Sequence, residues 1–129
     1  MLTALGLVLA ALAALAHVYF FVLESLWFDR ASTWRTFGIR DAEQAAAARP
    51  WAYNQGFYNL FLGLGTAVGV VLVAVGRVGV GASLVAFGCA CMLGAAIVLV
   101  TSDAARLRAA LVQGTPPALA LVLLWAGLH

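Results

Sequence analysis

The sequence predicts an all-α integral membrane protein: a bundle of four transmembrane helices with a short interfacial helical segment between the first and the second. The chain is 65% hydrophobic and only 9% charged, whereas a soluble domain usually carries about 25% charged residues. The apolar residues also gather in four long stretches separated by short polar segments. A chain this short buries only part of its surface on folding. Lipid must therefore cover the rest, and we expect a single membrane domain over residues 1–129.

Each apolar stretch is long enough for a transmembrane helix, which takes about 20 residues. We expect spans at residues 2–28, 50–76, 78–102 and 109–129. The first stretch is too long for the core of a cleaved signal peptide, and no basic residue precedes it. We therefore interpret it as a retained helix.

The fourth span contains Pro116 and Pro117, which leave two alternatives for its start. A helix that begins at Pro116, with Thr115 as its cap, would be about 21 Å long, which is short for a hydrocarbon core of about 30 Å. A helix that begins near Ala109 would have to bend at the prolines. We expect a kinked or shortened fourth helix in the membrane, because the uncharged run at residues 118–128 is too apolar to lie in water.

The segment 29–49 is the longest polar part of the chain. Asp41 followed by Gln44 and four alanines predicts capped helical turns leading into Pro50. Trp34 and Phe37 stand among arginines, which indicates that the earlier part lies in the membrane interface. A solvated loop is the alternative for that part.

The arginines predict the orientation of the chain. Two segments that share one side of a four-span protein, 29–49 and 103–115, hold Arg30, Arg35, Arg40, Arg49, Arg106 and Arg108. The other side holds both termini and Arg77. Since basic residues stay in the cytoplasm, we expect a cell (inner) membrane protein with both termini outside the cytoplasm. The net charge of +2 is too small to indicate a nucleic-acid partner, so the expected partner is the lipid bilayer.

Two ionisable residues, His17 and Glu24, interrupt the first apolar stretch. Such residues inside a span are candidates for a functional site. A spacing of seven residues is almost two helical turns, so we expect both side chains on one face. Phe20, Phe21 and Trp27 flank them.

The second span opens with the polar block Asn54-Gln55-Gly56-Phe57-Tyr58-Asn59. Asn54 pairs with Tyr58 and Gln55 with Asn59 at i, i+4, so the polar surface covers about half of the helix. The first two spans run antiparallel and share the end of the bundle at which this block lies. If their polar faces meet, one half of the membrane holds a ladder of His17, Glu24, Asn54, Gln55, Tyr58 and Asn59.

This ladder suggests a site for a lipophilic small molecule, and the residues leave open whether the molecule is only bound or also converted. Glu24 would donate or accept a proton, with His17 as its relay, in a reaction such as an isomerisation. The polar residues of the second span (Asn54, Gln55, Tyr58 and Asn59) would orient the ligand. The rings of Trp27 and of Phe20 or Phe21 would stabilise a cation.

Two other functions fit the same residues. A small homo-oligomeric carrier could use His17 and Glu24 to couple transport to protons or to bind a cation. A structural or accessory subunit would use the polar side chains only to join helices. In that case Glu24 could also reach the lipid headgroups and pair with Arg30.

No cofactor and no metal are expected. The sequence has no phosphate-binding glycine loop, no paired metal-ligand motif and no Ser/His/Asp arrangement. Cys89 and Cys91 lie inside an apolar run and are interpreted as packing residues. Small residues on the second span (Gly65, Gly69) and the third (Gly81, Gly88, Ala95) predict close contacts between helices.

The residues that form the predicted ladder also carry a family resemblance. His17 with Glu24, followed by the block Asn54–Asn59, resembles the small bacterial membrane proteins grouped as domain of unknown function 1304. The similarity covers essentially the whole chain, and the Asn-Gln-Gly-x-Tyr-Asn pattern is its most specific part. The resemblance implies a membrane protein of four spans, and it implies no activity or ligand.

Overall fold

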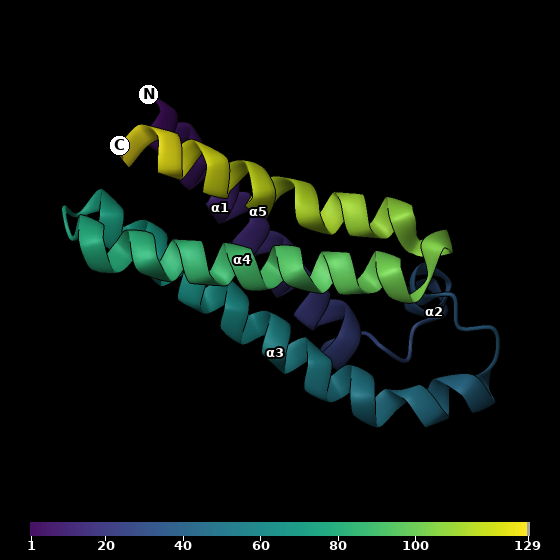
Figure 1. Ribbon diagram of the computed structural model, residues 1–129. Coiled ribbons are helices and arrows are strands. Elements are labelled where there is room, and N and C mark those ends of the chain that lie inside the picture. The colour runs from purple at the N-terminus through teal and green to yellow at the C-terminus, as the bar shows by residue number, and fades with distance from the viewer. Residues whose placement is uncertain (129) are drawn as a thin grey trace. The chain divides into compact units, whose positions relative to one another are not determined.

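The structure, a computed structural model, describes residues Met1–Leu128 and contains only helices there (Figure 1). Four of the helices are long and apolar enough to cross a membrane, which confirms the predicted fold class. The first is α1 (Leu2–Phe21), which continues into a π-helical turn (Val22–Leu26). The short α2 (Ala31–Phe37) is followed by α3 (Ala42–Ala74) and α4 (Val78–Ser102). A 3-10 turn (Ala104–Arg106) leads into α5 (Leu107–Leu128).

The third helix starts earlier than the predicted span and runs without interruption through Pro50. Its start is the predicted cap: the Gln44 backbone N–H donates to Asp41 Oδ1 over 2.8 Å, and Gln44 Oε1 accepts from the Arg40 backbone N–H over 2.9 Å. With 33 residues, α3 is about 50 Å long. That length exceeds a hydrocarbon core of about 30 Å. The charged first turns of α3 can therefore extend beyond the membrane.

The fifth helix begins at Leu107 and contains both prolines, so the alternative of a helix that starts at Pro116 is wrong. Proline inside a helix removes one backbone hydrogen bond. Transmembrane helices tolerate this loss because neighbouring helices and local adjustments satisfy the freed groups. The predicted end of the span, His129, lies outside the described residues.

Residue contacts divide the described chain into two compact units. The larger unit contains residues 1–16 and 62–128, and the smaller unit contains residues 17–61. Helices α1 and α3 each contribute to both units, since the divisions fall inside them.

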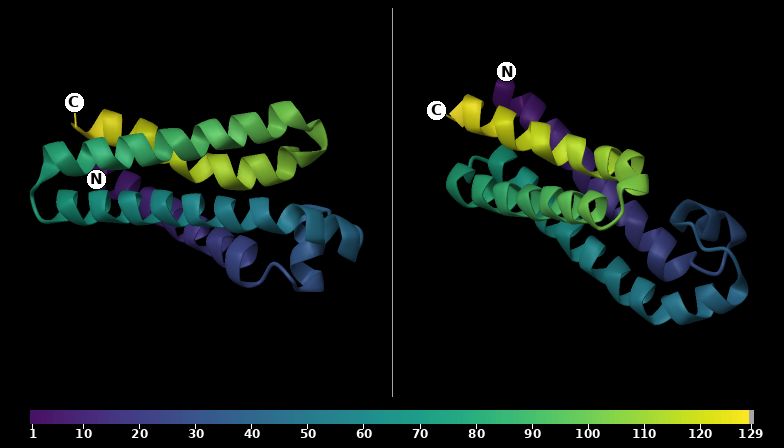
Figure 2. Two further views of the ribbon diagram at one scale, coloured as in Figure 1. Left: turned by 90° about the horizontal axis from the view of Figure 1, so that it is seen from below. Right: turned by 45° about the vertical axis from the view of Figure 1, so that its right-hand side comes forward.

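The larger unit has a core of small and aliphatic side chains. Ala10 of α1 lies in this core with Val85 and Cys89 of α4 and with Ala120 and Leu124 of α5. Helices α4 and α5 run antiparallel, side by side (Figures 1 and 2). The start of α1 also meets the end of α5, where Thr3 Oγ1 donates to the Gly127 carbonyl over 3.0 Å.

Glycines allow α3 and α4 to approach closely within the larger unit. A β-carbon on Gly81 would lie 2.6 Å from the Val73 backbone nitrogen and 2.7 Å from the Gly69 carbonyl oxygen. Glycine pairs of this kind let membrane helices pack backbone against backbone. The predicted contacts at Gly69 and Gly81 are thus confirmed, whereas Gly65 faces open space.

Two further predicted packing positions on α4 differ from each other. Gly88 is buried, and a β-carbon there would meet the hydroxyl of Thr66. Ala95 is exposed, and its neighbour Ala96 makes the contact instead, 2.9 Å from where a β-carbon on Gly114 would lie. A seven-residue repeat drifts around a straight helix, so the last position of the predicted stripe turns away from the contact.

The outward face of α1 in the larger unit is apolar. Leu5, Val8, Leu12 and Leu15 are exposed at 49%, 56%, 51% and 65%. Their spacing of three and four residues places them in one stripe along the helix. An exposed stripe of this length fits a helix whose outer surface is covered by lipid.

The smaller unit contains the end of α1, the π-helical turn, α2 and the first half of α3. The helical segment predicted between the first two spans is therefore present as α2. Phe28 and Thr33 are buried, at 3% and 2% exposure. An ion pair between Arg49 Nη2 and Asp29 Oδ2, 3.1 Å long, joins α3 to the segment that follows the π-helical turn. The six residues of the predicted polar ladder all belong to this unit.

Candidate functional site

The buried carboxyl group of Glu24 lies at the centre of the candidate site. Glu24 is only 6% exposed. Its Oε2 accepts a hydrogen bond from Asn59 Nδ2 over 2.7 Å, and its Oε1 accepts one from Gln55 Nε2 over 3.2 Å. The structure thus brings together three of the polar residues predicted to form a ladder. We call Glu24, Gln55 and Asn59 the Glu24 cluster.

The helical periodicity of α3 explains this pairing. Gln55 and Asn59 are four residues apart, so their side chains project from one face of α3. The rings of Phe21 and Phe57 meet edge to face at 5.1 Å between centroids. Phe57 is two positions from both Gln55 and Asn59, so the end of α1 and the middle of α3 share a polar contact and an aromatic contact on different faces of α3.

Glu24 lies within the π-helical turn, where the backbone is wider than an α-helix. The Trp27 backbone N–H donates to the Val22 carbonyl over 2.8 Å, five residues back. π-helical turns are rare and are frequently found at functional sites. The sequence did not predict this turn, because no residue type in Val22–Leu26 marks it.

The π-helical turn lies very close to α3 at Gly56. A β-carbon on Gly56 would be 3.1 Å from the Glu24 β-carbon and would collide with the hydroxyl of Ser25. Ser25 Oγ also donates to the Tyr53 carbonyl over 3.0 Å. Ser25 and Gly56 therefore hold the backbone of the turn against α3 and position Glu24 beside Asn59. Neither role was predicted from the sequence.

Asn54 and Tyr58 lie outside the Glu24 cluster. Tyr58 is 62% exposed, and Asn54 is exposed as well. Each is two positions from Gly56, which is about 200° around a helix. The close contact at Gly56 therefore turns both side chains toward the opposite face of α3. This glycine is the sequence signal that distinguishes the two i, i+4 pairs of the polar block.

His17 is fully buried and meets Phe20 edge-on, with 5.2 Å between ring centroids. Its predicted alignment with Glu24 assumed an unbroken α-helix between the two residues. The π-helical turn begins at Val22, so that spacing no longer determines their relative orientation. The role of His17 as a proton relay stays a prediction.

The side chain of Trp27 is occupied on one face. The guanidinium carbon of Arg30 lies 4.0 Å from the centroid of the Trp27 ring, a distance at which a cation is attracted to an aromatic face. Arg30 is therefore engaged with Trp27, and the Glu24 carboxyl group has amide partners rather than the arginine considered above. That face of Trp27 is not open to a ligand.

Charged partners are scarce around Glu24. The ion pairs found between residues 1 and 128 are Arg49–Asp29 and Arg106–Asp103, and neither includes Glu24. The same part of the chain contains no group of three histidine, cysteine, aspartate or glutamate side chains that could hold a metal ion. The carboxyl group is thus held by neutral amides.

Each carboxyl oxygen of Glu24 retains acceptor capacity beyond its hydrogen bond to an amide. A carboxylate has about four lone-pair positions, and the amides of Gln55 and Asn59 use one on each oxygen. Gln55 is itself exposed, whereas Glu24 is buried.

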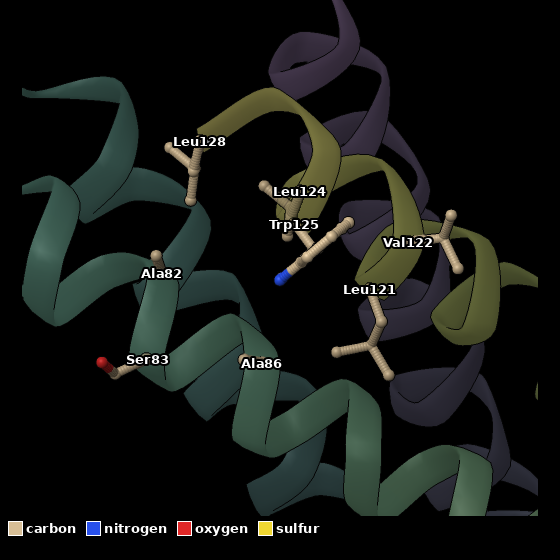
Figure 3. A pocket seen from close by; sticks show the side chains of 8 residues that line it. All are labelled: Ala82, Ser83, Ala86, Leu121, Val122, Leu124, Trp125 and Leu128. Atoms are coloured by element: carbon tan, nitrogen blue, oxygen red, sulfur yellow. The ribbon is translucent and has the colours of Figure 1, made fainter.

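A groove in the larger unit lies between α4 and α5 and has a volume of about 580 Å³ (Figure 3). Trp125 extends from α5 into this groove, while the hydroxyl of Ser83 turns away and donates to the Gly79 carbonyl over 2.9 Å. The remaining lining residues are Ala82, Ala86, Leu121, Val122, Leu124 and Leu128. No charged side chain lines the groove, so it offers an apolar surface and no acid or base.

Comparison with known proteins identifies the family of the chain. A family model described as "Protein of unknown function (DUF1304)" matches residues 11–125, which include the Glu24 cluster and most of the four long helices. Searches of curated proteins and of solved structures found no match. The match covers more than half of the sequence and agrees with the resemblance carried by His17, Glu24 and the polar block. The chain belongs to this family of unknown function.

Proposed function

We propose that the Glu24 cluster is a binding site within the membrane for a lipophilic small molecule. The observation that carries the proposal is a buried carboxyl group held in a π-helical turn by two amides of the facing helix, with acceptor positions to spare. Proton transfer between Glu24 and the bound molecule is the reaction that such a site would support.

A purely structural role explains Glu24 less well. An acidic residue at the centre of a transmembrane helix costs about 2.5–3.5 kcal/mol, and a polar contact between membrane helices returns about 0.6 kcal/mol on average. Glu24 lies near the end of its span, where this cost is lower. Its two hydrogen bonds return only about 1.2 kcal/mol together on that scale. A leucine would pack at this position without any such cost.

Other contacts already hold the two helices together at this point. Ser25 donates to the Tyr53 carbonyl, Gly56 allows the backbones to approach, and Phe21 packs against Phe57. The carboxyl group is therefore not needed to join α1 to α3. Because other contacts already join these helices, ligand binding explains the presence of Glu24 better than helix assembly does.

The sequence offers a direct test, because Asn54 and Asn59 are its only asparagines. Selective ¹⁵N-asparagine labelling gives two side-chain amide signals, one from the Glu24 cluster and one from the exposed face of α3. The protein is reconstituted in phosphatidylcholine nanodiscs and titrated with twelve-carbon molecules that differ only in headgroup: an alcohol, an acid, an amide, an amine and a trimethylammonium.

We expect at least one member of this panel to shift the Asn59 signal saturably while the Asn54 signal stays in place. The shift should be lost in Glu24→Gln and kept in Glu43→Gln, a matched control at an exposed glutamate of α3. Failure of every molecule to move the Asn59 signal would contradict the proposal and favour a structural role.

A further inference from the structure

We infer that the molecule bound by the Glu24 cluster carries an ammonium group with at least one N–H, attached to a lipophilic body. This inference rests on the proposed function and specifies its ligand. The groups that carry it are the carboxyl group and its two amides.

The Glu24 cluster has more free acceptors than free donors. After accepting from Asn59 and Gln55, each oxygen of Glu24 has a second position for a donor, while each amide keeps its own oxygen as an acceptor and one further N–H as a donor. The hydroxyl donor of Ser25 is already used by the Tyr53 carbonyl. The cluster therefore offers more acceptors than donors, and the complementary ligand is a hydrogen-bond donor.

The Glu24 carboxyl group has no ion pair with an arginine of the described chain. Arg30 stacks on Trp27, and Arg49 pairs with Asp29, so these two arginines of the smaller unit are engaged elsewhere. Charged groups inside membranes are usually paired with one another or mark the path of a substrate or ion. A cationic ligand would supply the opposite charge that the amides cannot supply.

The described side chains separate an organic cation from a metal ion. Tyr53, Phe57 and Phe61 form a row of rings along α3, with 5.1 and 6.2 Å between successive centroids, but Phe57 is two positions from both Gln55 and Asn59 and therefore lies about 200° around the helix from the amides of the cluster. A metal ion needs several anionic or imidazole ligands, and the described chain gathers no group of three such side chains.

An ammonium group with an N–H should bind Glu24 more tightly than one without. A protonated amine donates charge-assisted hydrogen bonds to a carboxylate, which are shorter and roughly twice as strong as neutral ones. A trimethylammonium group has the same charge and no N–H, and an alcohol has a donor and no charge. The two compounds therefore isolate the two properties on which the inference depends.

Two sources could supply this chemistry, because Glu24 lies close to the end of its span. One is the ethanolamine headgroup of a membrane phospholipid, and the other is a free lipophilic amine. Both present a primary ammonium group to the cluster from the lipid side. The experiment below distinguishes them by the lipid used in the nanodisc.

The test compares dodecylamine, dodecyltrimethylammonium and dodecanol in phosphatidylcholine nanodiscs, with the Asn59 side-chain signal as the readout. We expect dodecylamine to bind about tenfold or more tightly than either of the others, and we expect Glu24→Gln to abolish this preference while Glu43→Gln keeps it. The ranking of the three compounds on the unaltered protein tests the inference even if Glu24→Gln does not fold.

Dodecanol or dodecyltrimethylammonium binding as tightly as dodecylamine would overturn the inference and leave the proposed function intact. No saturable shift with any of the three probes, nor with the acid or amide of the panel, would contradict both.

A second arm replaces phosphatidylcholine with phosphatidylethanolamine. An Asn59 shift without any added amine, together with loss of the dodecylamine response, would assign the site to the lipid headgroup. A dodecylamine response that is the same in both lipids would assign it to a free amine. Either result supports the ammonium chemistry.

Discussion

Gly56 of α3 lies directly against Ser25 of the π-helical turn, with no room for a side chain between them. The contact brings the backbone of the turn close enough for the Ser25 hydroxyl to reach the Tyr53 carbonyl. It also sets the distance from Glu24 to Asn59. A glycine and a serine that carry no charge thus determine the geometry of the acidic site.

Gly56→Ala should destabilise the protein by about 1–3 kcal/mol, the usual range for an overfilled contact. The added β-carbon would collide with the Ser25 hydroxyl and push the π-helical turn away from α3. The free energy of unfolding in detergent measures the effect. Gly65→Ala is the matched control on the same helix, because nothing lies within 4 Å of its β-carbon position. Equal stability of the two variants would contradict the close contact.

Asn59→Ala should lower stability more than Gln55→Ala does. The Asn59 bond to Glu24 is the shorter of the two, at 2.7 Å against 3.2 Å, and Gln55 is exposed where water or lipid headgroups can replace it. We expect a coupling of about 0.6 kcal/mol or more between Glu24 and Asn59. A double-mutant cycle with Glu24→Ala measures this coupling. A coupling of zero would mean that the bond does not form in the membrane.

Thr66→Val should leave the stability unchanged or raise it by about 1 kcal/mol. Thr66 is fully buried against Gly88, and its Oγ1 has no hydrogen-bond partner among the described residues. Removing an unsatisfied buried polar atom while keeping its shape is neutral or favourable. Thermal unfolding compares this variant with Thr101→Val, whose hydroxyl donates to the Ile97 carbonyl. A clear loss of stability in Thr66→Val would reveal a partner for the hydroxyl.

The arginine distribution predicts that the segment between α1 and α3 faces the cytoplasm. On a background without Cys89 and Cys91, single cysteines are placed at Ala46 and at Gly79, which are both exposed. Ala46 lies near the start of α3, and Gly79 lies near the start of α4, after the turn that follows α3. In intact cells, a membrane-impermeant maleimide should label Gly79→Cys and spare Ala46→Cys. Broken cells should label both. The reverse pattern in intact cells would place both termini in the cytoplasm.

The positions of the long helices could be predicted because apolar length alone selects them. The start of α3 followed from Asp41 and Gln44, whose side chains cap the helix as their spacing indicates. The continuation of α3 through Pro50 and of α5 through Pro116 did not follow. Proline usually ends a helix in water, but within a membrane a helix is the structure that satisfies the backbone, so the chain keeps it.

The candidate site could be predicted in part. The polar residues of the first two spans predicted a ladder that contains Glu24, Gln55 and Asn59, and the structure brings these three together. Asn54 and Tyr58 were predicted in the same ladder and lie outside the cluster.

The π-helical turn could not be predicted from the sequence. One extra residue in a helical turn changes the backbone geometry but leaves the composition and the hydropathy pattern unchanged. Gly56 was the neglected signal, since a glycine in a polar helical block marks the face of close approach.

The hydrogen bond from Thr3 to the Gly127 carbonyl places the first turn of α1 beside the last turns of α5. Chain ends that lie together can usually be joined and reopened elsewhere. A short linker between them, with new ends in the exposed connection at Gly38 and Arg40, should give a circular permutant that keeps the helix contacts. In such a permutant the two segments that form the Glu24 cluster, the π-helical turn after α1 and the middle of α3, would be connected only through the rest of the chain. Retained amide signals would then show that packing alone assembles the cluster.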